Sequence, residues 1–232
     1  MNALLTLPGF SNPVDDSQAV FRAVLTALSR PGIPDSLQLP SFPVPAGELS
    51  PGMLALALAL CDQDTPIWLD AAADTPEVCH HLRFHCAAPF AAEPTQGSFA
   101  FISRSETMPR LQEFNPGRAD YPDRSATLVI SADLSFPQAC ILELTGPGVK
   151  DNDLGAWQSF RISGLPLWFW DDWKMNRAAY PLGVDVIFVD KTTENEGNTV
   201  IRLLGLPRTA RVRLAPHEQI DSLPSKEHGS CM

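Results

Sequence analysis

The segment that decides the fold is PIWLDAAADTPEVCHHLRFHCAAPFAAEPTQGSFAFIS, residues 66–103. Its two ends, Pro66–Asp70 and Ser98–Ser103, are short apolar runs with aromatic and β-branched residues, which is typical of strands. Between them, Pro76–His85 has the pattern of a helix. Strand, helix and strand in this order predict an α/β layered fold.

Similar signals recur along the chain. Strands are expected at residues 36–39, 126–131, 139–145, 184–190, 199–204 and 210–214. The last strands are close enough in sequence to be antiparallel neighbours, so the expected sheet is mixed. Helices are expected at residues 14–29, with Asp15 or Asp16 as N-cap, and at 53–61, 106–114 and 165–179. The resulting prediction is a three-layer α/β fold, a mixed sheet with flanking helices.

Composition bounds the class of protein. The chain is 44% hydrophobic and 19% charged, as in ordinary folded domains. We expect a single α/β domain over residues 1–215 and a polar C-terminal tail over 216–232. The net charge of −10 argues against nucleic acid and anionic membranes as partners. No run approaches the ~20 apolar residues of a membrane span. Five cysteines without a CxxC pair fit a reducing, cytoplasmic location.

One cluster invites a metal hypothesis. His81 and His85 stand four residues apart and would share one face of a helix. A hydrolytic zinc helix of this spacing places Glu directly after its first His, but Leu82 stands there. The sequence therefore favours a half-exposed helix without metal, and a metal-dependent hydrolase is the alternative.

A pyridoxal phosphate (PLP) enzyme is a second alternative, because it needs only one suitable lysine. The chain has four lysines, Lys150, Lys174, Lys191 and Lys226. Lys191 follows a predicted strand but heads a polar turn, where a solvated lysine is the usual outcome. We therefore expect no cofactor.

Two further motifs have both a functional and a structural interpretation. Thr145–Gly148 (TGPG) follows a strand as phosphate loops do, but Pro147 lacks an amide hydrogen, so a tight turn is favoured over a ligand cleft. Leu165–Trp173 is rich in tryptophan, which fits a partner interface or a core helix with Asp171 and Asp172 facing water.

Seven separated segments together resemble one known family, the H subunit of the bacterial carbon-phosphorus lyase core complex (the PhnH family). They are FRAVLTALSRPG (21–32), DQDTPIWL (62–69), LRFHCAAP (82–89), SATLV (125–129), LTGPG (144–148), PLGVDVIFV (181–189) and GLPRTARV (205–212). Their joint order and spacing carry the resemblance. His80, His81 and the flanking cysteines do not belong to the family pattern, whereas His85 does.

The resemblance implies a fold similar to the large domain of PLP-dependent transferases, without the cofactor. It also implies assembly with the G, I and J subunits. In that family G, H and I, with an ATPase-like L subunit, are linked to exchanging the adenine of ATP for a phosphonate. The product is α-D-ribose 1-alkylphosphonate 5-triphosphate, whose carbon-phosphorus bond J later cleaves. The chain would then be an accessory subunit of ribose 1-methylphosphonate 5-triphosphate synthase rather than an enzyme alone, and we expect a homodimer in isolation.

An anionic phosphonate or nucleotide would need charge-assisted donors. The family-matching residues with that chemistry are Arg83, His85, Arg208 and Thr209. In the alternative interpretation, Arg83 and Arg208 pair with acids and brace the fold. The acids considered are Asp62, Asp64 and Asp185.

Overall fold

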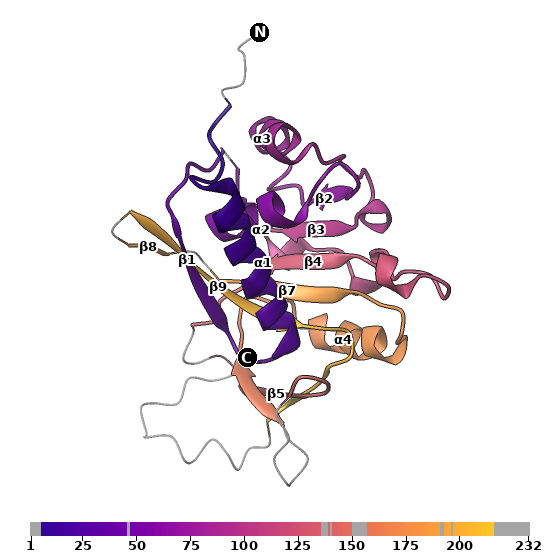
Figure 1. Ribbon diagram of the computed structural model, residues 1–232. Helices are drawn as coiled ribbons and strands as arrows, with labels where there is room; N and C mark the ends of the chain where they lie inside the picture. Colours follow the sequence, from indigo (N-terminus) through magenta and orange to yellow (C-terminus); the bar gives the residue numbers. More distant parts are fainter. Residues whose placement is uncertain are drawn as a thin grey trace.

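A seven-stranded mixed sheet lies at the centre of the computed structural model, which describes residues 6–45, 47–135, 139, 141–149, 157–190, 193–195 and 197–215 (Figure 1). The strands are β1 (Asp35–Pro40), β2 (Ile67–Leu69), β3 (Phe99–Ile102), β4 (Thr127–Ser131), β7 (Asp185–Val189), β8 (Thr193–Asn195) and β9 (Asn198–Leu206). Their order is β1-β9-β7-β4-β3-β2, and β8 also pairs with β9. Pairs from β7 to β2 are parallel, and all pairs of β9 are antiparallel. The predicted mixed α/β sheet is confirmed.

The central strands are apolar on both faces because both faces are covered. In β7, Val186 and Phe188 pack into one core cluster, and Ile187 and Val189 pack into the other. Successive side chains of a strand point to opposite faces, so a doubly covered strand shows a continuous apolar run. This explains the sequence VDVIFVD.

Helices α1 (Pro13–Ser29), α2 (Pro51–Leu60) and α3 (Pro76–Cys86) contribute to the first cluster and cover one face of the sheet, with α1 in front in Figure 1. Helix α4 (Phe169–Ala178) packs into the second cluster on the opposite face. The flanking helices are thus confirmed. The likeness to the large domain of PLP-dependent transferases stays a prediction.

A second, three-stranded sheet was not predicted. It consists of β5 (Ile141–Thr145) between β6 (Gln158–Arg161) and β10 (Arg211–Leu214), all antiparallel. We expected β10 as a neighbour of the preceding strand in the main sheet. It pairs with β5 instead, on the α4 side, because Leu142, Leu144 and their neighbours complete the second core cluster.

Three helix predictions need correction. The N-cap position of α1 is Asn12 rather than Asp15 or Asp16, because Pro13 occupies the first turn, and the Asp16 carboxylate accepts a bond from the Asn12 backbone amide at 2.9 Å. Helix α4 begins at residue 169, later than predicted. Residues 106–114 form no α-helix, because Pro109 lacks an amide hydrogen and disfavours helical backbone at Met108.

Short 3₁₀ turns occupy that stretch instead. They are η2 (Ser105–Thr107) and η3 (Leu111–Glu113). The described chain has two further 3₁₀ turns elsewhere, η1 (Pro94–Gln96) and η4 (Pro122–Arg124). The predicted tail over 216–232 lies outside the described residues.

Candidate functional site

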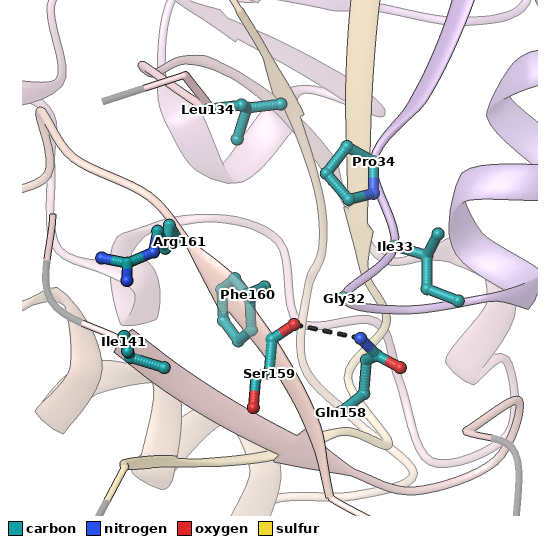
Figure 2. A pocket seen from close by; sticks show the side chains of 9 residues that line it. All are labelled: Gly32, Ile33, Pro34, Leu134, Ile141, Gln158, Ser159, Phe160 and Arg161. Carbon is teal, nitrogen blue, oxygen red and sulfur yellow. Dashed lines mark hydrogen bonds between the residues drawn. The ribbon is translucent and has the colours of Figure 1, made fainter. Parts of the chain in front are cut away.

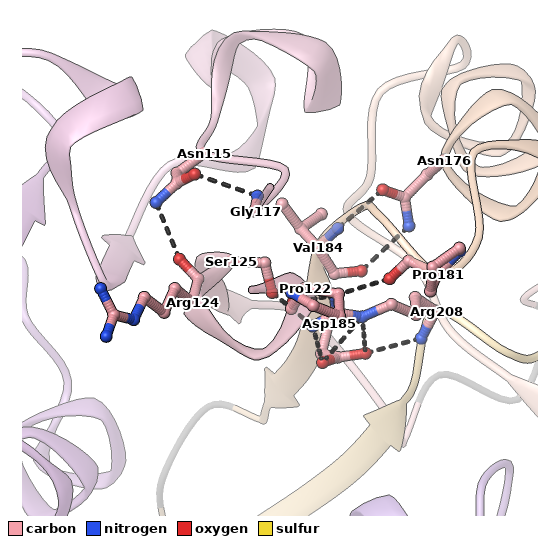
Figure 3. A network of polar contacts seen from close by, with 10 residues as sticks. All are labelled: Asn115, Gly117, Pro122, Arg124, Ser125, Asn176, Pro181, Val184, Asp185 and Arg208. Atoms are coloured by element: carbon pink, nitrogen blue, oxygen red, sulfur yellow. Dashed lines mark hydrogen bonds and ion pairs between the residues drawn. The ribbon is translucent and has the colours of Figure 1, made fainter. Parts of the chain in front are cut away.

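Arg208 lies directly after β9 and is the centre of a polar network (Figure 3). Its guanidinium pairs with Asp185 and donates to Ser125 Oγ. It also donates to the carbonyl oxygens of Pro122, at 2.9 Å, and Pro181, at 3.3 Å. The Arg208 side chain is only 13% exposed, so these bonds hold the starts of β4 and β7 to the end of β9. This is the bracing arrangement that the sequence offered as the alternative.

The other predicted ligand residues do not join Arg208 in one cleft. Thr209 uses its carbonyl to accept a bond from Arg177 Nε of α4 at 3.0 Å. Arg83 is exposed on α3, with its guanidinium 4.8 Å from the centroid of the Phe90 ring. His85 Nε2 is 2.9 Å from the Leu7 carbonyl oxygen. The two pairs therefore lie in different parts of the fold, one on α3 and the other after the end of β9.

The histidine face of α3 has an unusual member. His81 is 2% exposed, and neither ring nitrogen has a hydrogen-bond partner among the residues that the structure describes. Burial, and then the neighbouring His85 and His80, lower the pKa of His81 to about 4. The rings of His81 and His85 are 4.4 Å apart, as their spacing predicts. Within the described ranges, no group of three or more His, Cys, Asp or Glu is placed to hold a metal ion.

The remaining candidates have structural contacts. Asp62 accepts from the Asp64 amide at 2.9 Å, the Asx turn that such residues commonly form. Lys174 pairs with Asp171 at 2.8 Å on the surface of α4. Lys150, Lys191 and Lys226 lie outside the described residues.

The Trp-rich segment is mostly core. Trp173 is 1% exposed and donates its indole hydrogen to the Ala210 carbonyl at 3.1 Å. Asp172 is fully buried, pairs with Arg110 and accepts from the Leu111 amide at 3.0 Å. The prediction that both acids face water is therefore wrong for Asp172, because the carboxylate ties α4 to η3. Asp171 is exposed as predicted.

Two adjoining pockets lie between the loop after α1 and the second sheet, and Figure 2 shows the larger one. The larger has a volume of about 590 Å³. Its lining residues are Gly32, Ile33, Pro34, Leu134, Ile141, Gln158, Ser159, Phe160 and Arg161. The smaller, of about 310 Å³, shares Ile33 and Gln158 with it and adds Arg30, Pro31, Gly148 and Val149. Of this site, only the TGPG turn was a candidate from the sequence.

The pockets form where two turns meet, SRPG (29–32) and TGPG (145–148). These turns are distant from each other in sequence. Gly148 has a φ of +86°, and a Cβ there would lie 2.2 Å from the Ser29 carbonyl oxygen. Gly32 has a φ of +81°, and a Cβ there would lie 2.8 Å from the Leu144 side chain. Only glycine allows this approach. The TGPG turn thus lines a pocket, the interpretation that the sequence favoured less.

The fold and these contacts define an α/β protein whose family-matching arginine braces the structure and which has two adjoining pockets at two glycine turns. Residues 8–213 match the family model described as bacterial phosphonate metabolism protein (PhnH). The chain therefore belongs to the PhnH family.

Two relatives agree with this. The chain is 35% identical over 205 residues to the alpha-D-ribose 1-methylphosphonate 5-triphosphate synthase subunit PhnH of Rhizobium meliloti (strain 1021), covering 88% of this chain and 93% of the relative. It is 33% identical over 107 residues to the putative C-P lyase subunit protein HtxG of Stutzerimonas stutzeri, covering 45% and 47% of the two chains. None of the helices in the described part of the chain is long and apolar enough to cross a membrane.

Proposed function

We propose that the chain is an accessory subunit of a ribose 1-methylphosphonate 5-triphosphate synthase. With G, I and L subunits it would serve the reaction of ATP with an alkylphosphonate, which releases adenine and forms α-D-ribose 1-alkylphosphonate 5-triphosphate. The observation that carries the proposal is the match over 93% of a relative that bears this subunit name.

The contacts of the family-matching arginine support an accessory role. Arg208 is the best phosphonate ligand by chemistry, but its donors are already used by a carboxylate, a hydroxyl and two carbonyl groups. An anion would have to break this network in order to bind there. We therefore assign Arg208 to stability, and the chemistry of the reaction to the assembly.

Assembly with the G, I and J subunits is tested by co-expression with an affinity tag on this chain alone. We expect the other core subunits to co-purify. The reconstituted subunits should release adenine from ATP when methylphosphonate is added, and omission of this chain should abolish the release. Adenine release at an unchanged rate without the chain would overturn the proposal.

The isolated chain should also differ from an independent enzyme. Under the proposal it carries no PLP absorbance near 400–430 nm and no stoichiometric metal, and it acts in the cytoplasm. A cofactor band or one metal ion per chain would instead establish one of the two alternative enzyme classes.

We further propose that the isolated chain is a homodimer. Val14, Phe21 and Leu25 are exposed apolar residues on one side of α1, and an apolar surface favours self-association. Light scattering should give twice the chain mass of 25.3 kDa at micromolar concentration. A purely monomeric protein would contradict this.

A further inference from the structure

The second sheet has an open edge at β10. In the order β10-β5-β6, β10 is an outer strand, and no strand besides β5 pairs with it in the described part of the chain. The Ala215 amide donates to the Ile141 carbonyl oxygen at 3.0 Å and continues this antiparallel ladder. Because hydrogen-bonded pairs alternate along such a ladder, the backbone groups of Val212 and Leu214 point away from β5. Each of these two residues therefore presents a donor and an acceptor at the open edge.

Side chains of α4 bond to the chain just before β10 rather than to the strand itself. Trp173 Nε1 donates to the Ala210 carbonyl oxygen at 3.1 Å, and Arg177 Nε donates to that of Thr209 at 3.0 Å. Further along, the strand is exposed, and Leu214 is 68% exposed. An accessible edge with aligned donors and acceptors can accept a further strand.

The two faces of β10 differ in chemistry. Side chains alternate along a strand, so Arg211 and Arg213 share one face, and Val212 and Leu214 share the other. Val212 packs against the second core cluster, whereas most of the Leu214 side chain contacts solvent. A strand added at this edge would therefore meet basic and apolar side chains in alternation.

The basic face of β10 has fewer acids than arginines. Arg213 pairs at 2.8 Å with Glu143, which stands opposite it on β5. Arg211 stands opposite Thr145, and none of the ion pairs within the described residues involves it. The edge is thus locally basic in a chain with a net charge of −10. Carboxylates on an added strand would be favoured here, because opposite charges on neighbouring strands attract.

The same charges disfavour a second copy of this chain as the added strand. Antiparallel pairing of two β10 strands through both open residues would put Leu214 of each copy opposite Val212 of the other. The two Arg213 side chains would then lie directly opposite each other. Like charges in this position destabilise a sheet, so a strand of different sequence is favoured.

We infer that the open edge of β10 docks an extended segment of another protein, in which carboxylate and apolar side chains alternate. The backbone of this segment bonds to Val212 and Leu214 and adds one strand to the three-stranded sheet. Its carboxylates contact Arg211 and Arg213, and its apolar side chains cover Leu214.

An acetylated and amidated peptide of alternating Glu and Val tests the inference on the isolated, full-length chain. In calorimetric titration it should bind at least about tenfold more tightly than a peptide of alternating Lys and Val of equal length, because the basic face attracts carboxylates. At saturation, amide hydrogen exchange at Val212 and Leu214 should slow at least about tenfold. Absence of Glu-Val binding at millimolar concentration would overturn the inference, as would equal affinities of the two peptides or unchanged exchange.

Two variants at one position separate backbone pairing from side-chain contact. Leu214→Pro removes an N–H that points away from β5, and proline is tolerated at such edge positions. Leu214→Ala also shortens the side chain but keeps the N–H. The proline variant should bind the Glu-Val peptide at least about tenfold more weakly than the alanine variant. Equal affinities would refute strand addition. If Leu214→Pro fails to fold in a thermal melt, the exchange measurement on the parent still decides.

An arginine variant tests the charge preference. Arg211→Gln should reduce the preference for the Glu-Val over the Lys-Val peptide, because it removes the guanidinium that has no acid opposite it on β5. Arg22→Gln, at an exposed position on α1, is the matched control and should leave the preference unchanged. Equal preferences in the two variants would show that Arg211 does not contact the segment.

Assignment of the partner to the G, I or J subunit rests on the proposed function. In co-expression, the tagged Leu214→Pro chain should lose at least one subunit that both the parent and Leu214→Ala retain. Retention of every subunit by Leu214→Pro would overturn this assignment. A parent that co-purifies with no subunit would contradict the proposed function instead, and the peptide result would be unaffected.

Discussion

Replacement of the buried His81 by leucine should make the protein less sensitive to acid. His81 is 2% exposed, and in the described part of the chain neither of its ring nitrogens has a hydrogen-bond partner. A protonated ring at this place would bury a charge without compensation. The folded chain therefore keeps His81 neutral, with a pKa of about 4, whereas the unfolded chain binds a proton near the ordinary pKa of about 6.5.

The sign and size of the effect follow from this difference. Between these two pKa values the unfolded state binds more protons, so stability is complete above about pH 6.5 and falls as the pH decreases toward 4. At about 1.4 kcal/mol for each tenfold change in proton affinity, the full loss is about 3 kcal/mol. Between pH 7 and pH 5, His81 should account for about 2 kcal/mol of it.

Urea unfolding of the two proteins at pH 7 and pH 5 measures this contribution. The His81→Leu variant should be at least as stable as the parent at pH 7, because it removes two unpaired polar atoms. It should lose about 2 kcal/mol less than the parent on going to pH 5. His80→Gln, on the same helix but only half-buried, is the matched control and should retain the acid sensitivity. An equal loss in His81→Leu and the parent would refute the reasoning.

Three further variants test the contacts that support the fold. Arg208→Ala should lower the unfolding free energy by about 2–4 kcal/mol. Arg208→Lys should restore little of this stability, because an ammonium group lacks the planar fork of donors. A melting temperature equal to the parent's would make Arg208 a ligand candidate again. Gly148→Ala should lower the stability measured by thermal unfolding by about 2 kcal/mol or more, because its Cβ would lie 2.2 Å from the Ser29 carbonyl oxygen and the backbone φ is +86°. An unchanged melting curve would contradict that geometry. Asp172→Asn should cost about 2–3 kcal/mol in urea unfolding, whereas Asp171→Asn on the exposed side should cost almost nothing, and equal effects would mean that Asp172 is not the buried partner.

Local signals in the sequence predicted much of the central sheet. Within VDVIFVD, residues 186–189 (VIFV) are all apolar because β7 is covered on both faces, and the pattern depends only on residues within the strand. Likewise Ser50 caps α2 by accepting from the Met53 amide at 3.3 Å, a contact within four residues. Features set by neighbours in sequence can be predicted without a structure.

The second sheet could not be predicted in this way. Strand β6 has the sequence QSFR, which has little strand propensity and one buried apolar side chain, Phe160. It forms a strand because β5 offers free backbone groups and an apolar surface. Such pairing depends on tertiary context more than on the strand itself. The error in the 106–114 helix has a local cause instead, because Pro109 disfavours helical backbone at Met108.

The sequence by itself determined the α/β class, most strand positions, the excess of negative charge and, through seven separated segments, the family. Tertiary structure decided which polar residues are available to bind a ligand. Arg208 and Asp185 are 23 residues apart, and only their approach neutralises the arginine that sequence chemistry offered as a ligand. The glycines of SRPG and TGPG are 116 residues apart, and only their packing forms the pockets. Charge pairing and cavity shape depend on distances in space, which the order of residues along the chain does not specify.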